Sequence, residues 1–168
     1  FFMQKKVVIA LPNNSSYFPG LKRAFNYLGW ESYFFDFRKF SLKEKYLLIV
    51  TKNQKQAISG LNLRLQSYLK EKNPELFFVM KGETIQQGTL KFAKKMGVTT
   101  VNWFPDYVNA FELALRLSSY YDYFYHFDPL SVSKLKKAGR KNVYYLPFAA
   151  DILPDDKKLQ VKDKVPCR

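Results

Sequence analysis

Short apolar runs alternate with helical segments along most of this 168-residue chain. The apolar runs are bounded by charged residues, Pro or Gly, while the segments between them carry apolar residues three or four positions apart. Gly29, Gly97 and Gly139 stand where three of these helices would end. Strands that alternate with helices in this way indicate a parallel sheet built from right-handed crossovers. The sequence therefore predicts a doubly wound, Rossmann-like α/β domain of about six strands with helices on both faces.

The pattern locates each element of this domain. We expect strands at residues 5–11, 31–37, 74–80, 99–104, 123–127 and 142–146. We expect helices at residues 19–28, 87–96, 110–117 and 130–138, and one long or two shorter helices over 41–71 with Gly60 as the candidate break. Residues 1–151 then form one domain. The polar, charged stretch 152–168 has the composition of a linker or tail.

Positive charge is concentrated in one segment. The formal net charge is +14, and half of it lies between Arg38 and Lys72, where the acidic residues are Glu44 and Glu71. A basic amphipathic helical segment suits an anionic membrane surface. Because no signature of a DNA- or RNA-binding domain accompanies the segment, nucleic acid ranks below membrane as a partner. A non-catalytic basic module that docks to an anionic membrane is therefore one hypothesis for this chain.

Several other classes of protein are excluded or disfavoured. The only cysteine, Cys167, has no partner for an internal disulfide, and no Cys/His cluster predicts a metal site. No apolar stretch approaches the roughly 18 to 20 residues of a membrane span, and residues 7–11 are too short for a signal-peptide core. We expect a cytoplasmic protein, held peripherally at the inner membrane face if the basic segment binds lipid. The two ends suggest a piece of a longer protein.

Three of the expected strands end on an acidic residue, namely Asp106, Asp128 and Asp151. In open α/β sheets ligands bind outside the carboxyl ends of the strands, so these residues predict a ligand site at that edge. The loop 12–20 has one glycine, which excludes the dinucleotide fingerprint and the P-loop, and no nucleophile elbow occurs. Receiver domains are excluded because Asn13, rather than an acidic pair, follows the first strand.

An ordered set of motifs carries a family resemblance. The set comprises residues 77–82, Thr100-Val-Asn-Trp-Phe-Pro-Asp106, 120–129, 135–139 and Leu146-Pro-Phe-Ala-Ala-Asp151. Together they resemble the N-terminal half of the CgeB/YkvP-like (spore maturation protein) glycosyltransferases. The resemblance covers residues 76–151 well and the first 40 residues loosely.

The resemblance implies a function. Such enzymes have the GT-B architecture, in which two Rossmann-like domains face each other across a cleft. The N-terminal domain tends to bind the acceptor and the C-terminal domain the nucleotide-sugar. This chain would then bind a sugar acceptor, need no cofactor of its own, and depend on a second domain for the nucleotide-sugar donor. By itself it is expected to be inactive.

Sugar transfer needs a base for the acceptor hydroxyl or electrostatic support for a cationic sugar. Asp106 is the first candidate for either role, and the alternative is a helix N-cap or turn aspartate. His126 and Asp128 lie two residues apart in a strand and share one side of it, so they are candidates for moving a proton. Their alternatives are a packed core histidine and a helix cap.

The other candidates would bind the acceptor: Asn13, Lys81, Gly82, Glu83, Trp103 and Asp151. Gly82 would let backbone approach a ligand closely, although residues 81–84 also suit a plain turn. Trp103 would stack on a sugar ring or belong to the core. Asp151 is expected mainly to support the junction between domains.

Overall fold

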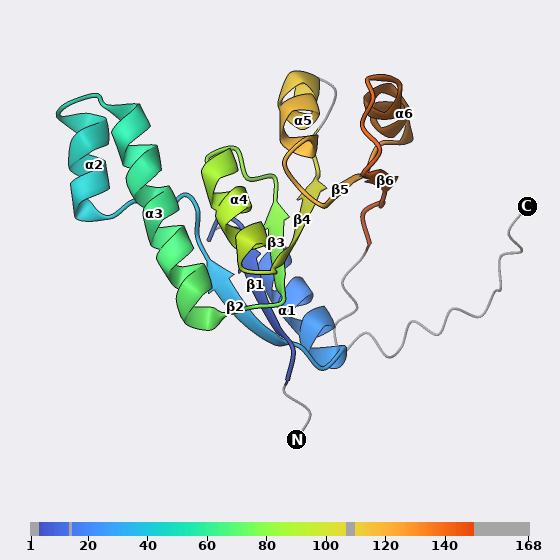
Figure 1. Cartoon of the computed structure of the whole chain (residues 1–168), viewed down its shortest axis with the longest axis horizontal. Coiled ribbons are helices and arrows are strands. Elements are labelled where there is room, and N and C mark those ends of the chain that lie inside the picture. The colour runs from blue at the N-terminus through green and yellow to red at the C-terminus, as the bar shows by residue number, and fades with distance from the viewer. Residues whose placement is uncertain (1–3, 14, 107–109, 150–168) are drawn as a thin grey trace, which may run out of the picture.

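The computed structural model describes residues 4–13, 15–106 and 110–149, which form a parallel sheet flanked by helices (Figure 1). The strands are β1 Lys6–Ala10, β2 Glu31–Phe35, β3 Leu76–Met80, β4 Thr99–Phe104, β5 Tyr123–His126 and β6 Val143–Tyr145. The helices are α1 Tyr17–Tyr27, α2 Leu42–Ile49, α3 Gln54–Lys72, α4 Gln87–Lys95, α5 Phe111–Ser118 and α6 Pro129–Lys137. The neighbour order is β2-β1-β3-β4-β5-β6, and every pair is parallel. The predicted fold class is confirmed.

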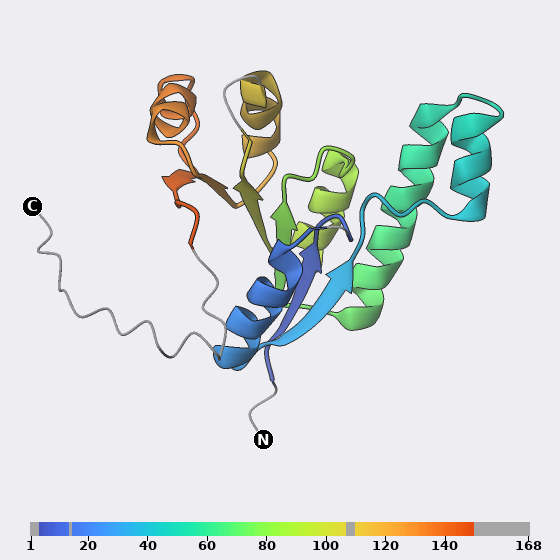
Figure 2. The same ribbon diagram turned by 180° about the vertical axis from the view of Figure 1, so that it is seen from behind.

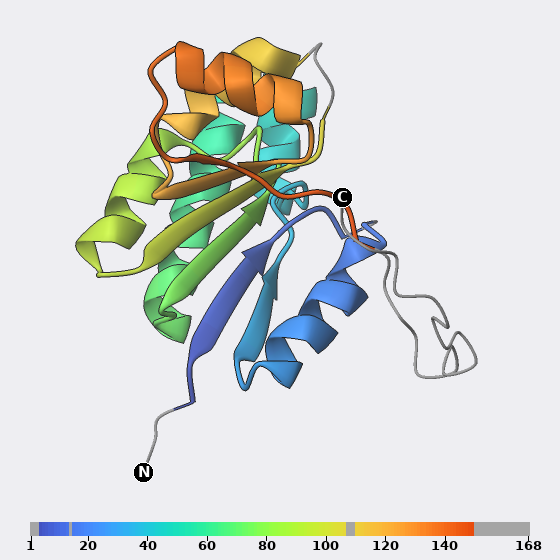
Figure 3. The ribbon, with the colours of Figure 1, turned by 90° about the vertical axis from the view of Figure 1, so that its right-hand side faces the viewer.

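The order of the strands determines which helices cover which face. From β1 the chain crosses to β2, then returns past β1 to β3 and continues outward to β6. Right-handed crossovers therefore place α1 on one face and α3 to α6 on the other. Figure 2 shows α1 in front of the sheet, and Figure 3 shows it on the opposite side from α4. We call these the α1 face and the covered face.

The covered face holds a closed core. Leu61, Leu65 and Leu69 of α3 are at most 1% exposed, and Leu90 of α4 and Leu135 of α6 are completely buried. Each such side chain stabilises the fold by roughly 1.5–3 kcal/mol when it leaves water. Most of the stabilising apolar burial outside the strands therefore comes from the helices of this face.

The described part of the α1 face is open over β5 and β6. No residue of α1 is fully buried, and Tyr27 and Leu28 are 91% and 67% exposed. Over β5 and β6 the rings of Tyr123 and Tyr125 contact Tyr144 with centroids 6.0 and 5.5 Å away, and no helix of the described residues lies above them. A groove of about 610 Å³ runs between α1 and residues 146–149.

The helical segment 41–71 breaks elsewhere than the sequence suggested. The turn lies at residues 50–53, and α3 continues through Gly60. A Cβ at Gly60 would lie 3.1 Å from Oε1 of Glu44, so this glycine leaves room for a side chain of α2. Glu44 forms a capping box with Ser41 and accepts hydrogen bonds from Arg64 of α3 at 2.9 Å. The glycine therefore serves helix packing, and Asn53 caps the new helix start.

Candidate functional site

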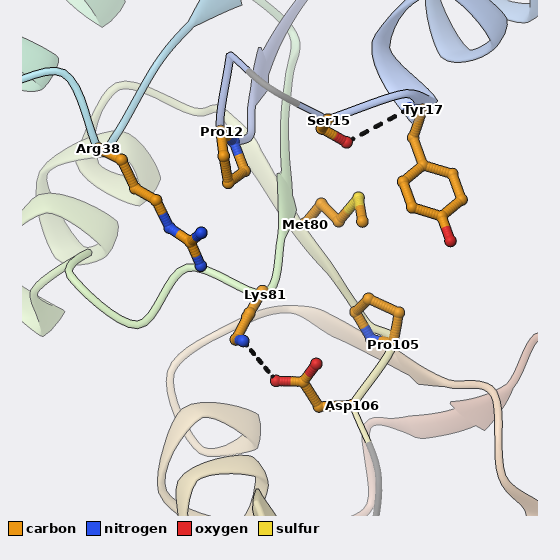
Figure 4. Close-up of a pocket in the computed structure, with 8 residues that line it drawn as sticks. All are labelled: Pro12, Ser15, Tyr17, Arg38, Met80, Lys81, Pro105 and Asp106. Atoms are coloured by element: carbon orange, nitrogen blue, oxygen red, sulfur yellow. Dashed lines mark hydrogen bonds and ion pairs between the residues drawn. The ribbon is translucent and has the colours of Figure 1, made fainter.

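The site lies where the strand order reverses, between β1 and β3. In open α/β sheets this switch point opens a crevice at the carboxyl ends of the strands. A cleft of about 260 Å³ lies there, and we call it the switch-point cleft (Figure 4). Its lining comes from the ends of four strands and the start of α1: Pro12, Ser15, Tyr17, Arg38, Met80, Lys81, Pro105 and Asp106.

An ion pair stands at the mouth of the cleft. Lys81 Nζ lies 2.7 Å from Asp106 Oδ2, and each side chain is 31% exposed. Among the described residues, Lys81 is the partner of the Asp106 carboxylate, and it contacts Oδ2. The N-cap of α5 is Ala110, which means that Asp106 is not the cap of that helix. Two predicted site residues, Lys81 and Asp106, are thus brought together.

The backbone of Lys81 is held in an unusual conformation. Its φ is 66°, in the left-handed region, which costs a residue other than glycine roughly 1–3 kcal/mol. Two hydrogen bonds maintain it, from Lys81 N to Trp103 O at 2.9 Å and from Asn102 Nδ2 to Lys81 O at 3.0 Å. Gly82 follows with φ 80°, and a Cβ there would lie 2.5 Å from Val79 Cγ1. Because Gly82 has no side chain, the turn can pack against Val79 without a clash. The turn places Lys81 in the lining of the cleft.

Arg38 also lines the cleft, although its sequence context indicates only a member of the basic segment. Its backbone N–H donates to Asp36 Oδ1 at 2.9 Å, and its Nε donates to Glu83 Oε1 at 3.0 Å. Glu83 itself does not line the cleft, so it acts by positioning Arg38. Ligands bind outside the carboxyl ends of parallel strands, which is the reason for selecting Asp106. The same reason applies to Arg38, because it follows the carboxyl end of β2 at the same edge of the sheet.

His126 and Asp128 do not line the cleft. His126 is 2% exposed and packs against Phe104, and its Nδ1 accepts the backbone N–H of Asp128 at 3.0 Å. Burial lowers the pKa of His126, although Asp128 and Asp106 oppose this shift. The Asp128 carboxylate caps α6 by accepting from the backbone N–H of Leu130 and Ser131. The structure favours the alternatives of a core histidine and a helix cap.

The remaining described candidates do not line the switch-point cleft. Trp103 is 7% exposed, lines the groove beside α1, and donates from Nε1 to Leu146 O at 3.3 Å. Asn13 is exposed in the loop next to Pro12 but is not part of the cleft wall. Asp151 lies outside the described residues. Within the described ranges no group of three or more His, Cys, Asp or Glu residues could hold a metal ion, and no helix has the length and apolarity to cross a membrane.

Neither a family model nor a curated protein matches the sequence. Similar solved structures include Arabidopsis thaliana UGT89C1, complexed with UDP (14% identity, TM-score 0.46) and alone (14%, 0.47), each matching 90% of this chain. Another is Glycyrrhiza uralensis UGT73P12 complexed with glycyrrhetinic acid 3-O-monoglucuronide, at 12% identity and TM-score 0.35 over 69% of this chain. The chain spans 45% of the length of UGT89C1 and 24% of UGT73P12. At this similarity we transfer no residue role, and the resemblance to CgeB-like enzymes rests on the sequence motifs alone.

Proposed function

We propose that this chain is the acceptor-binding domain of a GT-B glycosyltransferase and that the switch-point cleft binds the acceptor. The observation that carries the proposal is the Lys81–Asp106 pair in the lining of the cleft, in which Lys81 holds one oxygen of the carboxylate. The cleft occupies the edge at which open α/β sheets bind their ligands. The sequence motifs of residues 76–151 supply the reaction class.

The pair suits the chemistry of an acceptor hydroxyl. Asp106 Oδ1 would accept the hydroxyl proton, which strengthens the oxygen as a nucleophile toward the anomeric carbon of the donor. Lys81 holds Oδ2 and so fixes the direction in which the carboxylate faces. Arg38, oriented by Glu83, would add a second donor for acceptor hydroxyls from the opposite wall. Tyr17, Met80 and Pro105 provide apolar surface for the faces of a sugar ring.

The cleft fits an acceptor better than a nucleotide. Its volume of about 260 Å³ lies below the roughly 300–1,000 Å³ of typical small-molecule sites, so it suits a single sugar better than a whole nucleotide-sugar. The loop 12–20 lacks the glycines that bring backbone N–H groups to a pyrophosphate. The donor is therefore assigned to a second domain beyond these residues.

Binding measurements on the 168-residue chain test this proposal. Isothermal titration with a panel of mono- and oligosaccharides should find a ligand whose affinity falls roughly tenfold or more in Lys81→Met and Asp106→Asn, because each removes a hydrogen bond to a charged group. Lys94→Met is the matched control, since Lys94 pairs with Asp122 at 2.9 Å with similar exposure but lies in the last turn of α4, at the other edge of the sheet.

The outcome separates the proposal from its rival. A non-catalytic basic module would bind none of the saccharides, with or without these substitutions. Equal loss of affinity in Lys81→Met and Lys94→Met would likewise contradict the proposal. It would show that the affinity falls because a positive charge is lost, wherever that charge lies, and not because the cleft is altered.

A further inference from the structure

Helix α2 exposes an apolar stripe to solvent. Leu42, Tyr46, Ile49 and the adjoining Val50 are 86%, 57%, 74% and 62% exposed. Their spacing of four, three and one residues places them on one side of a helix with about 3.6 residues per turn. Glu44, which is buried against Arg64 of α3, marks the opposite side. We call these four residues the α2 stripe.

Unpaired lysines surround the α2 stripe. Lys43 and Lys45 lie on either side of it, and Lys52 and Lys55 follow in the turn and the first turn of α3. All four are exposed, and none forms an ion pair with a described residue.

The rest of the basic segment differs from this region. Arg38, Arg64 and Lys72 are paired with Glu83, Glu44 and Glu71. Of the six cations of the basic segment that form no ion pair with a described residue, four therefore lie around the α2 stripe.

The position of α2 leaves the stripe accessible. Figures 1 and 2 show α2 and α3 at one end of the molecule, with α2 outermost and the sheet on the other side of α3. The inner side of α2 is fixed by the capping box and by Arg64, so the helix presents a defined outer side. A stripe of this kind is not needed to hold the fold together.

Size and charge indicate what the stripe contacts. A stable protein interface buries about 800 Å² on each partner, which is more than a stripe of four side chains on an eight-residue helix provides. An interfacial helix needs only an apolar stripe that enters the headgroup and acyl boundary, with lysines beside it whose ammonium groups reach the headgroups. Anionic lipids attract such lysines.

We propose that α2 is an interfacial anchor that binds an anionic bilayer, the α2 stripe entering the lipid while Lys43, Lys45, Lys52 and Lys55 contact the headgroups. The anchor begins after the carboxyl end of β2, at the same edge as the switch-point cleft. The inference does not depend on the chain being a glycosyltransferase domain.

Sedimentation of the chain with lipid vesicles tests the anchor. The chain should bind vesicles of phosphatidylcholine mixed with phosphatidylglycerol, should not bind phosphatidylcholine alone, and should dissociate as salt is raised. Leu42→Ser combined with Ile49→Ser should weaken binding at least about tenfold, because two large side chains no longer leave water. Lys43→Gln combined with Lys45→Gln should weaken it by about the same factor.

Helix α6 supplies the matched control. Its Lys134 and Lys136 are exposed, but the one large apolar side chain that the described part of α6 exposes is Leu130. Lys134→Gln combined with Lys136→Gln removes the same charge and should leave vesicle binding nearly unchanged. Thermal unfolding should be unaltered in all three variants, since every substituted side chain is exposed.

Three results would overturn the anchor. The first is that the chain does not bind anionic vesicles. The second is full vesicle binding by the Leu42→Ser, Ile49→Ser variant. The third is equal loss in the α2 and α6 lysine variants, which would show general attraction to polyanions, nucleic acid included.

Discussion

The two faces of the sheet are built differently although they share the same strands. On the covered face four helices pack side by side, and Leu61, Leu65 and Leu69 of α3 are at most 1% exposed. On the other face α1 is the one helix among the described residues, and Tyr123 and Tyr144 are 43% and 40% exposed. All-parallel sheets occur almost only with both faces covered, so the α1 face presents unused apolar surface. The covered face holds the fold together, while the groove and the start of α1 at the cleft belong to the α1 face.

Strand β5 allows this comparison to be tested with neighbouring residues. Phe124 is completely buried and stacks on Phe104. Phe124→Ala should lower the free energy of unfolding by about 3–5 kcal/mol, because it leaves a cavity in the core. Urea denaturation measures this loss, and Phe124→Leu gives a smaller loss if the alanine variant does not fold. A loss below about 1 kcal/mol would mean that the covered face is not the main core.

Loss of the hydrogen bonds that join Glu44 of α2 to Arg64 of α3 should have the next largest effect on the free energy of unfolding. Burial raises the pKa of Glu44, but hydrogen bonds from Arg64 and Ser41 outweigh it and lower the pKa overall. Glu44→Gln should therefore destabilise the fold by about 1–3 kcal/mol at neutral pH. Because the folded pKa is depressed, this difference from the native protein is present above about pH 4.3 and disappears as pH falls further. A difference that is constant with pH would contradict this origin.

His126 predicts a second acid-sensitive step on the covered face. Burial lowers its pKa, so the unfolded chain takes up a proton before the folded chain does. Stability should fall as pH drops below about 6.5, by about 1.4 kcal/mol for each unit of pKa depression. His126→Gln should flatten the plot of unfolding free energy against pH in this range. An unchanged slope would show that His126 is not the titrating group.

The smallest effect is expected on the α1 face. Tyr123→Ala, one residue before Phe124, should change the free energy of unfolding by about 0.5 kcal/mol or less, since Tyr123 is already 43% exposed. The same urea denaturation measures it. A loss similar to that of Phe124→Ala would indicate that the two faces do not differ in their contribution.

The strands and helices were predictable because each apolar run is short and flanked by residues that end it. The sequence could not show whether the apolar side of a helix is buried by a neighbouring element. Leu21, Ala24 and Phe25 of α1 and its C-cap residue Leu28 recur at helical spacing, yet Leu28 is 67% exposed. Periodicity identifies the apolar side of a helix, whereas burial depends on a neighbouring element that the pattern does not contain.

The site was predictable to a similar extent. The strand-end rule located Asp106, because the carboxyl ends of parallel strands share one edge, and Lys81 was a candidate as part of the loop after the third strand. The rule also selected Asp128, and alternation along the strand added His126, but neither could reveal that His126 packs against Phe104 and that Asp128 caps α6. Arg38 was overlooked because a count of charge ignores where each cation lies.

The claim that acceptor hydroxyls bind at the switch-point cleft is tested most directly by amide NMR spectra of the isotope-labelled chain during titration with the best saccharide from the calorimetric panel, and separately with UDP. We expect the saccharide to shift the amides of Arg38, Lys81 and Asp106, and UDP to leave them in place. Saccharide shifts confined to other parts of the chain, or UDP shifts at these three amides, would contradict the assignment.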